Sequence, residues 1–128
     1  MTPPPFASSN IIELPVILHI KRLYRTIYQL GTRMPKQNKL GIHKKIEECA
    51  LSIMTLLIDS AFRSRSDKIH TLNQARRDIE ILKHLIRLEY ELNIIKEKSY
   101  IGMSHMLENI SMMTTGWIKS LGTQKPLY

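Results

Sequence analysis

Apolar residues recur along most of this chain at the spacing of an α-helix. In the first of four such segments they stand at Val16, Ile17, Ile20, Leu23, Tyr24, Ile27 and Leu30. This i, i+3, i+4, i+7 pattern places one apolar stripe along the side of a helix. The same period continues through three further segments, and no segment alternates convincingly with a period of two. The spacing predicts helices near residues 13–30, 36–62, 67–93 and 97–121.

Four helices joined by short links predict an all-α fold, an antiparallel up-down-up-down four-helix bundle. The 128 residues suit one domain, and 5 Gly and 6 Pro are too few for the turns of a sandwich or barrel. We expect a flexible N-terminal tail over 1–12, the bundle over 13–122 and a C-terminal tail over 123–128. Pro15 fits a first helical turn, Gly31 and Gly122 fit helix ends, and Ser66 fits an N-cap.

The positive charge of this chain is concentrated in one stretch. The whole sequence has 19 basic and 11 acidic residues, a net charge of +8. Residues 14–45 contain no acid and eight cations: Lys21, Arg22, Arg25, Arg33, Lys36, Lys39, Lys44 and Lys45. Such a stretch creates a local positive potential that favours nucleic acid, anionic lipid or an acidic protein surface. We therefore expect these residues, and Arg63 and Arg65 in the basic link after the second helix, to bind a polyanion.

The groupings of residues that catalysis or metal binding needs are missing from the sequence. No two of the five histidines stand four positions apart, and the Glu-x-x-His pattern of di-metal bundles is absent. We expect the histidines to lie at the surface or at helix edges. Cys49, the single cysteine, lies on an apolar stripe and is expected to be a buried structural thiol. The sequence thus predicts no catalytic residue, no metal and no cofactor, and a metal or redox bundle enzyme is the minor alternative.

No segment resembles a signal peptide or a membrane span. The longest apolar stretch, Ala50 to Ile58, is interrupted by Ser52 and Thr55. It is much shorter than the ~20 residues that a membrane-spanning helix requires. We expect a soluble, cytoplasmic protein that does not contact membrane.

The last helix has more apolar surface than one bundle core consumes. Met112 and Ile118 lie away from the stripe that contains Trp117, so both edges of this stripe are apolar. Extra apolar surface of this kind favours an oligomer, with Trp117, Met112 and Ile118 as the expected interface. We expect Tyr24, Tyr28 and Tyr100 to be packed, which would leave little aromatic surface for selecting single-stranded nucleic acid.

Five short motifs occur in a recognisable order along the chain. They are Leu14-Pro15-Val16-Ile17, Met34-Pro35-Lys36, Arg87-Leu88, Tyr100 and Gly116-Trp117-Ile118-Lys119-Ser120. Their order and spacing resemble the accessory variability determinant proteins of diversity-generating retroelements. The resemblance spans about residues 14–121. These proteins belong to a wider group of small four-helix bundles, which also includes proteins encoded by intervening sequences in large-subunit ribosomal RNA genes.

The resemblance implies a non-catalytic partner of a polymerase. It implies a basic, pentameric ring that binds the reverse transcriptase and its template RNA, or an RNA–DNA hybrid, and supports mutagenic reverse transcription. Residues that match the family pattern are Pro35, Lys39, Lys45, Arg87, Gly116, Trp117 and Lys119. Arg87 and Lys119 thereby join the expected binding residues.

Three positions depart from the family pattern. His43 replaces a small residue, Lys96 replaces a serine cap, and Thr114-Thr115 replaces a glycine-rich approach to Gly116. The alternative function is that of the ribosomal intervening-sequence type, whose role is unknown, with general RNA binding.

Overall fold

The computed structural model describes residues 14–122, which form five helices and no strand within that range. The helices are α2 (Pro15–Gly31), α3 (Lys36–Leu40), α4 (Ile42–Phe62), α5 (Arg65–Glu91) and α6 (Glu97–Gly122). The expected tails, residues 1–12 and 123–128, lie outside the described residues. The predicted all-helical class is confirmed, and the helix boundaries differ from the sequence prediction by one or two residues at most ends.

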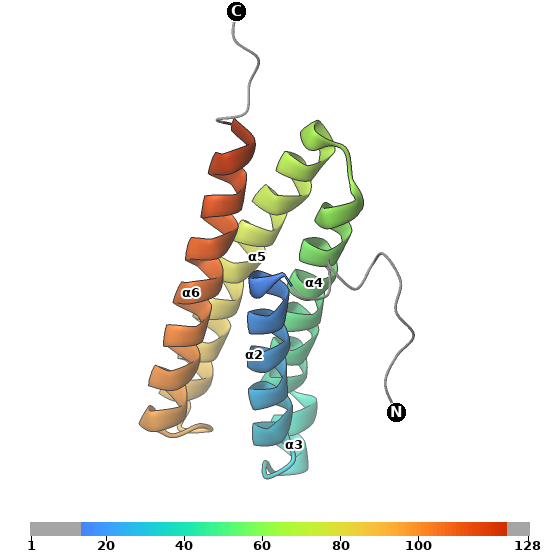
Figure 1. Cartoon of the computed structure of the whole chain (residues 1–128). Coiled ribbons are helices and arrows are strands. Elements are labelled where there is room, and N and C mark those ends of the chain that lie inside the picture. The colour runs from blue at the N-terminus through green and yellow to red at the C-terminus, as the bar shows by residue number, and fades with distance from the viewer. Residues whose placement is uncertain (1–13, 123–128) are drawn as a thin grey trace, which may run out of the picture.

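Four long helices lie side by side (Figure 1), and their buried side chains form one apolar interior. Helix α4 contacts α2 and α5, and α6 contacts the same two helices, so the contacts close around the interior. The short helix α3 packs against α4 at one end of the molecule. Short links connect successive helices, with residues 32–35 between α2 and α3, Gly41 between α3 and α4, 63–64 between α4 and α5 and 92–96 between α5 and α6.

The interior consists of the apolar stripes that the sequence spacing predicts. Its fully buried large side chains include Ile20, Leu23, Ile27, Ile46, Ile53, Leu57, Leu72, Ile79, Leu82, Ile86 and Met103. Within each helix these residues stand three, four or seven positions apart, so they share one side. Burying one such side chain contributes about 1.5–3 kcal/mol relative to leaving it exposed. Burial of these stripes therefore selects the helical packing.

The expected continuous helix over 36–62 is interrupted at Gly41, and this prediction was wrong. Helix α3 ends at Leu40, Gly41 has the non-helical torsions φ −94° and ψ −117°, and α4 begins at Ile42. A Cβ atom at Gly41 would lie 3.0 Å from the carbonyl oxygen of Gln37. Glycine permits this tight passage, and its low helix propensity makes it the natural site for a break.

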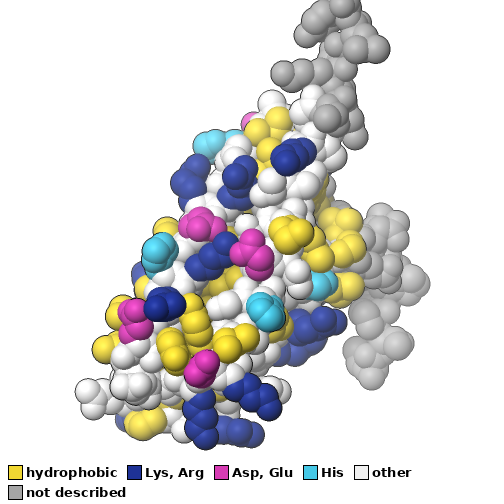
Figure 2. Space-filling model, turned by 90° about the vertical axis from the view of Figure 1, so that its left-hand side faces the viewer, with side chains coloured by type: hydrophobic (Ala, Val, Ile, Leu, Met, Phe, Trp, Pro, Cys, Tyr) yellow, Lys and Arg dark blue, Asp and Glu magenta, His cyan; other side chains and the backbone are white. Residues whose placement is uncertain are grey.

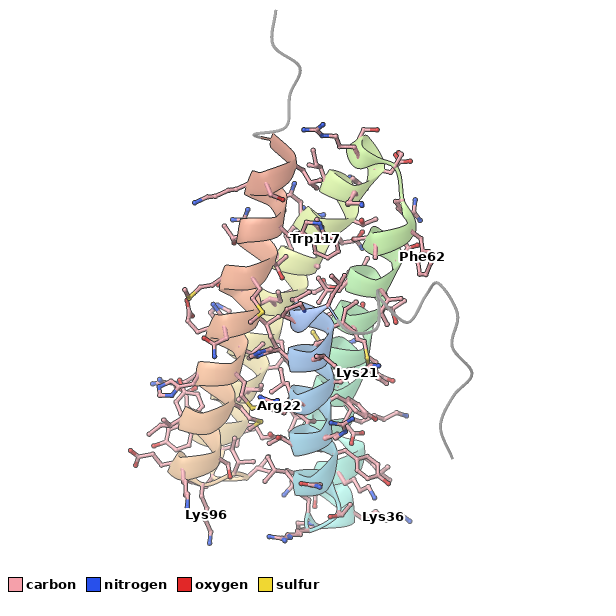
Figure 3. The ribbon with its side chains drawn as sticks, viewed as in Figure 1. Lys21, Arg22, Lys36, Phe62, Lys96 and Trp117 are labelled. Carbon is pink, nitrogen blue, oxygen red and sulfur yellow. The ribbon has the colours of Figure 1, made fainter. Side chains whose placement is uncertain are left out.

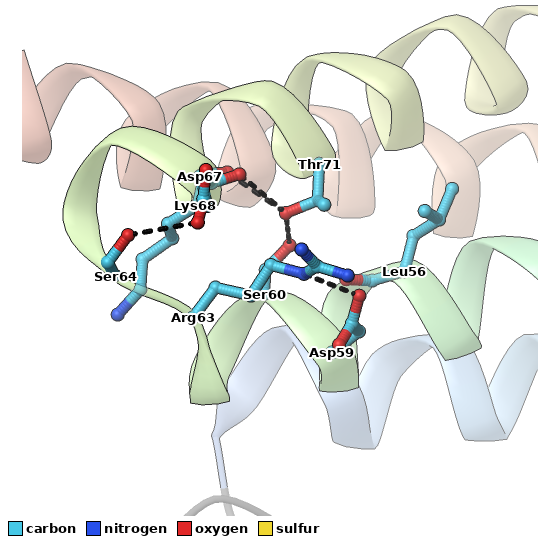
Figure 4. A network of polar contacts seen from close by, with 8 residues as sticks. All are labelled: Leu56, Asp59, Ser60, Arg63, Ser64, Asp67, Lys68 and Thr71. Atoms are coloured by element: carbon cyan, nitrogen blue, oxygen red, sulfur yellow. Dashed lines mark hydrogen bonds and ion pairs between the residues drawn. The ribbon is translucent and has the colours of Figure 1, made fainter.

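Hydroxyl groups join α4 to α5 near the link between them (Figure 4). Ser60 donates to the carbonyl of Leu56 at 2.7 Å, and its Oγ lies 2.5 Å from Oγ1 of Thr71. Both hydroxyls are buried. The N-cap of α5 is Ser64 rather than the expected Ser66, and the Ser64 hydroxyl donates to the Asp67 carboxylate at 3.2 Å. Asp67 is therefore held in the first turn of α5, where a negative charge complements the helix dipole.

Helix α5 ends in a Schellman motif. Asn93 has a positive φ of 61°, its amide donates to Tyr90, and the amide of Ile94 donates to the carbonyl of Glu89. Asparagine tolerates this left-handed conformation better than most side chains. The turn directs the chain into the short link before α6 and leaves Lys96 exposed there.

Candidate nucleic-acid and partner interface

The three cations of α2 do not form one cluster. Arg22 and Arg25 are exposed, whereas Lys21 is half-buried. Figure 3 shows Lys21 on the side of α2 toward α4 and Arg22 on the side toward α6. Successive residues of a helix point about 100° apart, so adjacent cations face different neighbours. The structure therefore spreads this positive charge over both flanks of the exposed side of α2.

The other five cations of residues 14–45 lie at or beyond the end of α2. Arg33 is in the link, Lys36 and Lys39 are on α3, and Lys44 and Lys45 are in the first turn of α4; all five are exposed. Figure 3 places Lys36 at the end of the molecule where Lys96 also lies. Together these residues make that end of the molecule basic.

Lys96 was not among the cations that the sequence predicted to bind a partner. It belongs to residues 46–98, in which nine basic and nine acidic residues cancel, so a segment-by-segment charge count gives no signal there. The α5–α6 link brings Lys96 to the end of the molecule that carries α3. Its departure from the family pattern, a lysine in place of a serine cap, was the available clue.

Most of the candidate cations have no acidic partner among residues 14–122. None of the eight cations between residues 14 and 45 forms an ion pair there, and Lys119 forms none. Flexible cations without a partner leave their charge available to an approaching polyanion. These nine side chains are the strongest candidates for phosphate contacts.

The three remaining candidates already have partners within the chain. Arg63 pairs with Asp59 at 2.8 Å, and Arg87 pairs with Glu91 at 3.0 Å while donating to the hydroxyl of Tyr100 at 3.1 Å. Arg65 donates from Nε to the carbonyl of Leu121 at 3.0 Å and from Nη2 to the same oxygen. Arg65 thus ties the start of α5 to the last turn of α6, a structural task that the sequence did not reveal.

Charge on the side of the molecule that carries α6 is mixed. Figure 2 shows acids, cations and hydrophobic side chains interspersed over the middle of that face, with Lys and Arg side chains toward both its upper and its lower end. Lys83 illustrates the mixing, because it pairs with both Glu80 and Glu108. A mixed surface has a weaker net potential than α2 and the basic end.

The three expected interface residues face different directions. Met112 is 65% exposed and lies opposite the buried stripe of α6, while Ile118 is half-buried at the edge of that stripe. Trp117 points inward from α6, beyond the first turn of α2 (Figure 3). The structure therefore does not bring these three side chains together on one surface.

Trp117 lies in an apolar groove because α2 is shorter than its neighbours. The groove has a volume of about 560 Å³ and is lined by Leu14, Pro15, Val16, Ala61, Lys68, Met113 and Trp117. The ammonium group of Lys68 lies 6.0 Å from the centre of the indole ring. Trp117 belongs to the inner stripe of α6, but α2 begins too late to cover it.

The expectation that all three tyrosines pack is wrong for Tyr28, which is 54% exposed. Tyr24 and Tyr100 are half-buried. Tyr100 stacks on Tyr90 with ring centres 4.6 Å apart, and the Arg87 guanidinium lies 5.6 Å from the Tyr100 ring. Tyr28 has no such cover, because its side chain leaves α2 at the edge of the buried stripe.

The expectation of surface histidines is wrong for His43, which is completely buried. Its Nε2–H donates to the carbonyl of Ile27 at 2.7 Å, and its Nδ1 lies 2.8 Å from the carboxylate of Glu89. Burial lowers the pKa of His43, but its hydrogen bonds to Glu89 and Ile27 and the charges of Glu89 and Glu47 outweigh that effect and raise the pKa above 6.5. Through these contacts His43 ties α2, α4 and α5 together near the basic end.

Among residues 14–122, neither the cysteine nor a cluster of metal-ligating side chains offers a reactive centre beside these cations. Cys49 is half-buried, its Sγ lies 3.5 Å from the carbonyl of Asp78, and burial raises the pKa of its thiol to about 11. A thiol with that pKa is protonated near neutral pH and is a poor nucleophile. Residues 14–122 contain no group of three or more His, Cys, Asp or Glu placed to hold a metal ion.

None of the helices in the described part of the chain is both long enough and apolar enough to span a membrane.

Comparison with known proteins identifies the family. No curated protein matches the chain. A family model described as bAvd-like matches residues 16–121, which include all five helices except the first residue of α2 and the last residue of α6. Because this match covers most of the sequence and agrees with the motifs from Leu14-Pro15 to Trp117, the chain belongs to the bAvd-like family of accessory variability determinant proteins.

Proposed function

We propose that this bAvd-like protein is a non-catalytic accessory factor of a diversity-generating retroelement. It binds the reverse transcriptase and the template RNA through cationic surfaces and supports mutagenic reverse transcription in the cytoplasm. The observation that carries this proposal is the set of eight cations in residues 14–45, none of which has an acidic partner in the described structure. Membership of the family supplies the biological setting.

The chemistry of these cations favours phosphate recognition. Lys and Arg contacts to phosphates position a protein on nucleic acid without reading its sequence. Each neutralised phosphate releases counterions, so the binding constant falls steeply with salt. We therefore expect RNA affinity that is strongly salt-dependent and only weakly dependent on base sequence.

Assembly into a ring would strengthen this surface. We propose that the four long helices form the antiparallel four-helix bundle of the family and that five such bundles close into a pentamer. Helix α5 supports self-association, because Ile81, Leu88 and its C-cap residue Leu92 stand at i, i+7 and i+11 on its outer side and are 44–55% exposed. In a cyclic oligomer each copy repeats the basic patch, so the summed potential exceeds that of one subunit.

Charge reversal on α2 tests the proposal. We expect Lys21→Glu, Arg22→Glu and Arg25→Glu together to abolish pull-down of the neighbouring reverse transcriptase or filter binding of RNA. Surface changes of this kind alter stability by less than about 0.5 kcal/mol each, so the fold should persist. If some RNA binding remains, its affinity should depend less on salt. The negative slope of log affinity against log salt should become less steep by about two to three units, because three phosphate contacts are lost.

The matched control reverses two exposed cations on α5, Arg76→Glu and Arg77→Glu. Asp78 and Glu80 follow these cations directly, so their local field is already diluted. Loss of binding in the α5 variant with retention in the α2 variant would show that the surface is wrongly placed.

Genomic context separates the family alternatives: a reverse-transcriptase gene with a template and variable repeat supports this proposal, and a ribosomal RNA gene supports the intervening-sequence type.

A further inference from the structure

An exposed aromatic surface lies directly beside unpaired cations on α2. Lys21, Tyr24, Arg25 and Tyr28 stand at i, i+3, i+4 and i+7, so they share one side of the helix. Tyr24, Arg25 and Tyr28, with Gln29, line a shallow hollow of about 250 Å³. The two rings are 6.3 Å apart and tilted by 35°, so they do not cover each other's faces.

The other tyrosine pair of the structure shows what a structural pair looks like in this protein. Tyr90 and Tyr100 are nearly parallel, at 6°, and Arg87 lies over the Tyr100 ring. In that pair the ring faces are occupied by each other and by a guanidinium that is itself paired with Glu91. Tyr28 differs in every respect: it is 54% exposed, and Arg25 beside it has no ion pair among the described residues.

The chemistry of the hollow matches an unpaired nucleobase attached to a phosphate chain. The face of a tyrosine ring stacks on any base, and the adjacent cations can hold the phosphates on either side of it. The amide of Gln29 adds a donor and an acceptor at the rim of the hollow. A duplex hides the faces of its bases, so only a single-stranded segment can use the ring.

We propose that Tyr28, supported by Tyr24 and flanked by Lys21 and Arg25, is a stacking site for an unpaired base of single-stranded RNA. The site rests on the proposed RNA-binding function and adds a preference for single strands over duplexes. Such a preference contrasts with the sequence-based expectation that the tyrosines are packed and that binding ignores strandedness.

The test uses the full chain and two fluorescent probes at one salt concentration, a short oligoadenylate and an RNA duplex of similar length. The variants are Tyr28→Leu, which keeps apolar bulk but removes the ring, and Tyr28→Phe, which keeps the ring. Leu18→Ala is the matched control, because Leu18 is an exposed apolar residue of the same helix. Light scattering and thermal unfolding of each variant report its assembly and fold.

Tyr28→Leu should weaken oligoadenylate binding about tenfold, the effect of losing one stacked base, while Tyr28→Phe and Leu18→Ala retain it. Duplex binding should change by less than about twofold in every variant, because phosphate contacts carry it. Unchanged oligoadenylate affinity in Tyr28→Leu, or an equal loss for both probes, overturns the stacking site alone. A change of assembly in Tyr28→Leu would assign the ring to a contact between copies and also overturn it. Failure of the wild-type chain to bind either probe would overturn the proposed function together with this site.

Discussion

At the scale of single residues, the buried pair of His43 and Glu89 is the most consequential contact in this molecule. Both side chains are fully buried, and one oxygen of Glu89, Oε1, has no hydrogen-bond partner in the described structure. A buried charge without its partner is strongly destabilising. The pair therefore makes the stability of the protein depend on the protonation of one histidine.

Stability should decline as the pH rises above about 6.5, the unfolded-state pKa of histidine. The folded-state pKa of His43 is raised, so the unfolded state releases this proton first. The stabilisation that the folded state gains from protonated His43 is complete below the unfolded-state pKa of about 6.5. It is lost as the pH passes through the higher folded-state pKa. Urea unfolding at a series of pH values from 6 upward measures this decline.

Glu89→Gln is the matching variant for this decline. A neutral His43 can donate from Nε2 to Ile27 and accept at Nδ1 from the new amide, so its proton no longer matters. We expect a flatter dependence of the unfolding free energy on pH in this variant. An identical slope in both proteins would contradict the assignment to His43.

Gly31 makes room for the His43 ring. A Cβ atom at this position would lie 2.8 Å from Cδ2 of His43, whose ring is held by two hydrogen bonds. Gly31→Ala should therefore lower the free energy of unfolding by about 1–3 kcal/mol, the usual cost of overpacking. Gly102→Ala is the control: no atom lies within 4 Å of the new methyl group, and removing a glycine from the interior of α6 should stabilise the protein by about 0.5–1 kcal/mol. Equal effects in thermal unfolding would contradict this role of Gly31.

At the scale of elements, the helices differ in how their ends are secured. Helix α2 begins late and leaves the groove beside Trp117, whereas the last turn of α6 is held by Arg65 from the start of α5. Helix α3 is separated from α4 by Gly41, which lets the following turn place His43 inward. The cations of the basic end therefore lie in the link after α2, on the short helix α3 and in the first turn of α4. The buried pair of His43 and Glu89 holds the start of α4 in place.

Arg65→Gln should loosen the end of α6 without affecting RNA binding. Losing the hydrogen bonds to Leu121 should cost about 1 kcal/mol of stability. Amide hydrogen exchange in the last turn of α6 should accelerate, while RNA affinity should stay within about twofold because this guanidinium already has a partner. A large loss of RNA affinity with unchanged exchange would return Arg65 to the binding surface.

At the scale of the whole molecule, the longest run of unpaired cations and the α5 apolar row lie on different helices. The cations of residues 14–45 lie on α2, on α3, in the link between them and at the start of α4, and the row of Ile81, Leu88 and Leu92 lies on α5 and its C-cap. This separation allows one surface to hold copies together while another remains free for a polyanion.

Introducing charge on the α5 row should dissociate the assembly. We expect the wild-type chain to scatter light as a species near five times the monomer mass of 14.9 kDa. Ile81→Lys with Leu88→Lys should shift it toward the monomer, because a buried unpaired cation opposes association. Leu51→Lys on α4 is the control, since Leu51 is 39% exposed and lies outside that row. A wild-type monomer, or a double variant that remains assembled, would contradict the proposed contact.

Helical periodicity was sufficient to predict the four long helices and the residues of their buried stripes. Each stripe depends only on residues three or four positions apart, so local spacing carries that information. The concentration of unpaired cations in residues 14–45 was equally visible, because a stretch without acids cannot form an ion pair with itself. The same periodicity overlooked the break at Gly41, since the apolar stripe continues across it.

Contacts between helices decided the rest. The burial of His43 depends on Glu89, 46 residues away, and on a glycine on a third helix, which no local pattern contains. The late start of α2 leaves Trp117 in a groove, and the direction in which Tyr28 leaves α2 keeps its ring exposed. The partners of Arg63, Arg65 and Arg87 separate structural cations from free ones. Each of these outcomes depends on which side of one helix meets another, and that is set by the packing of the whole core rather than by spacing along the chain.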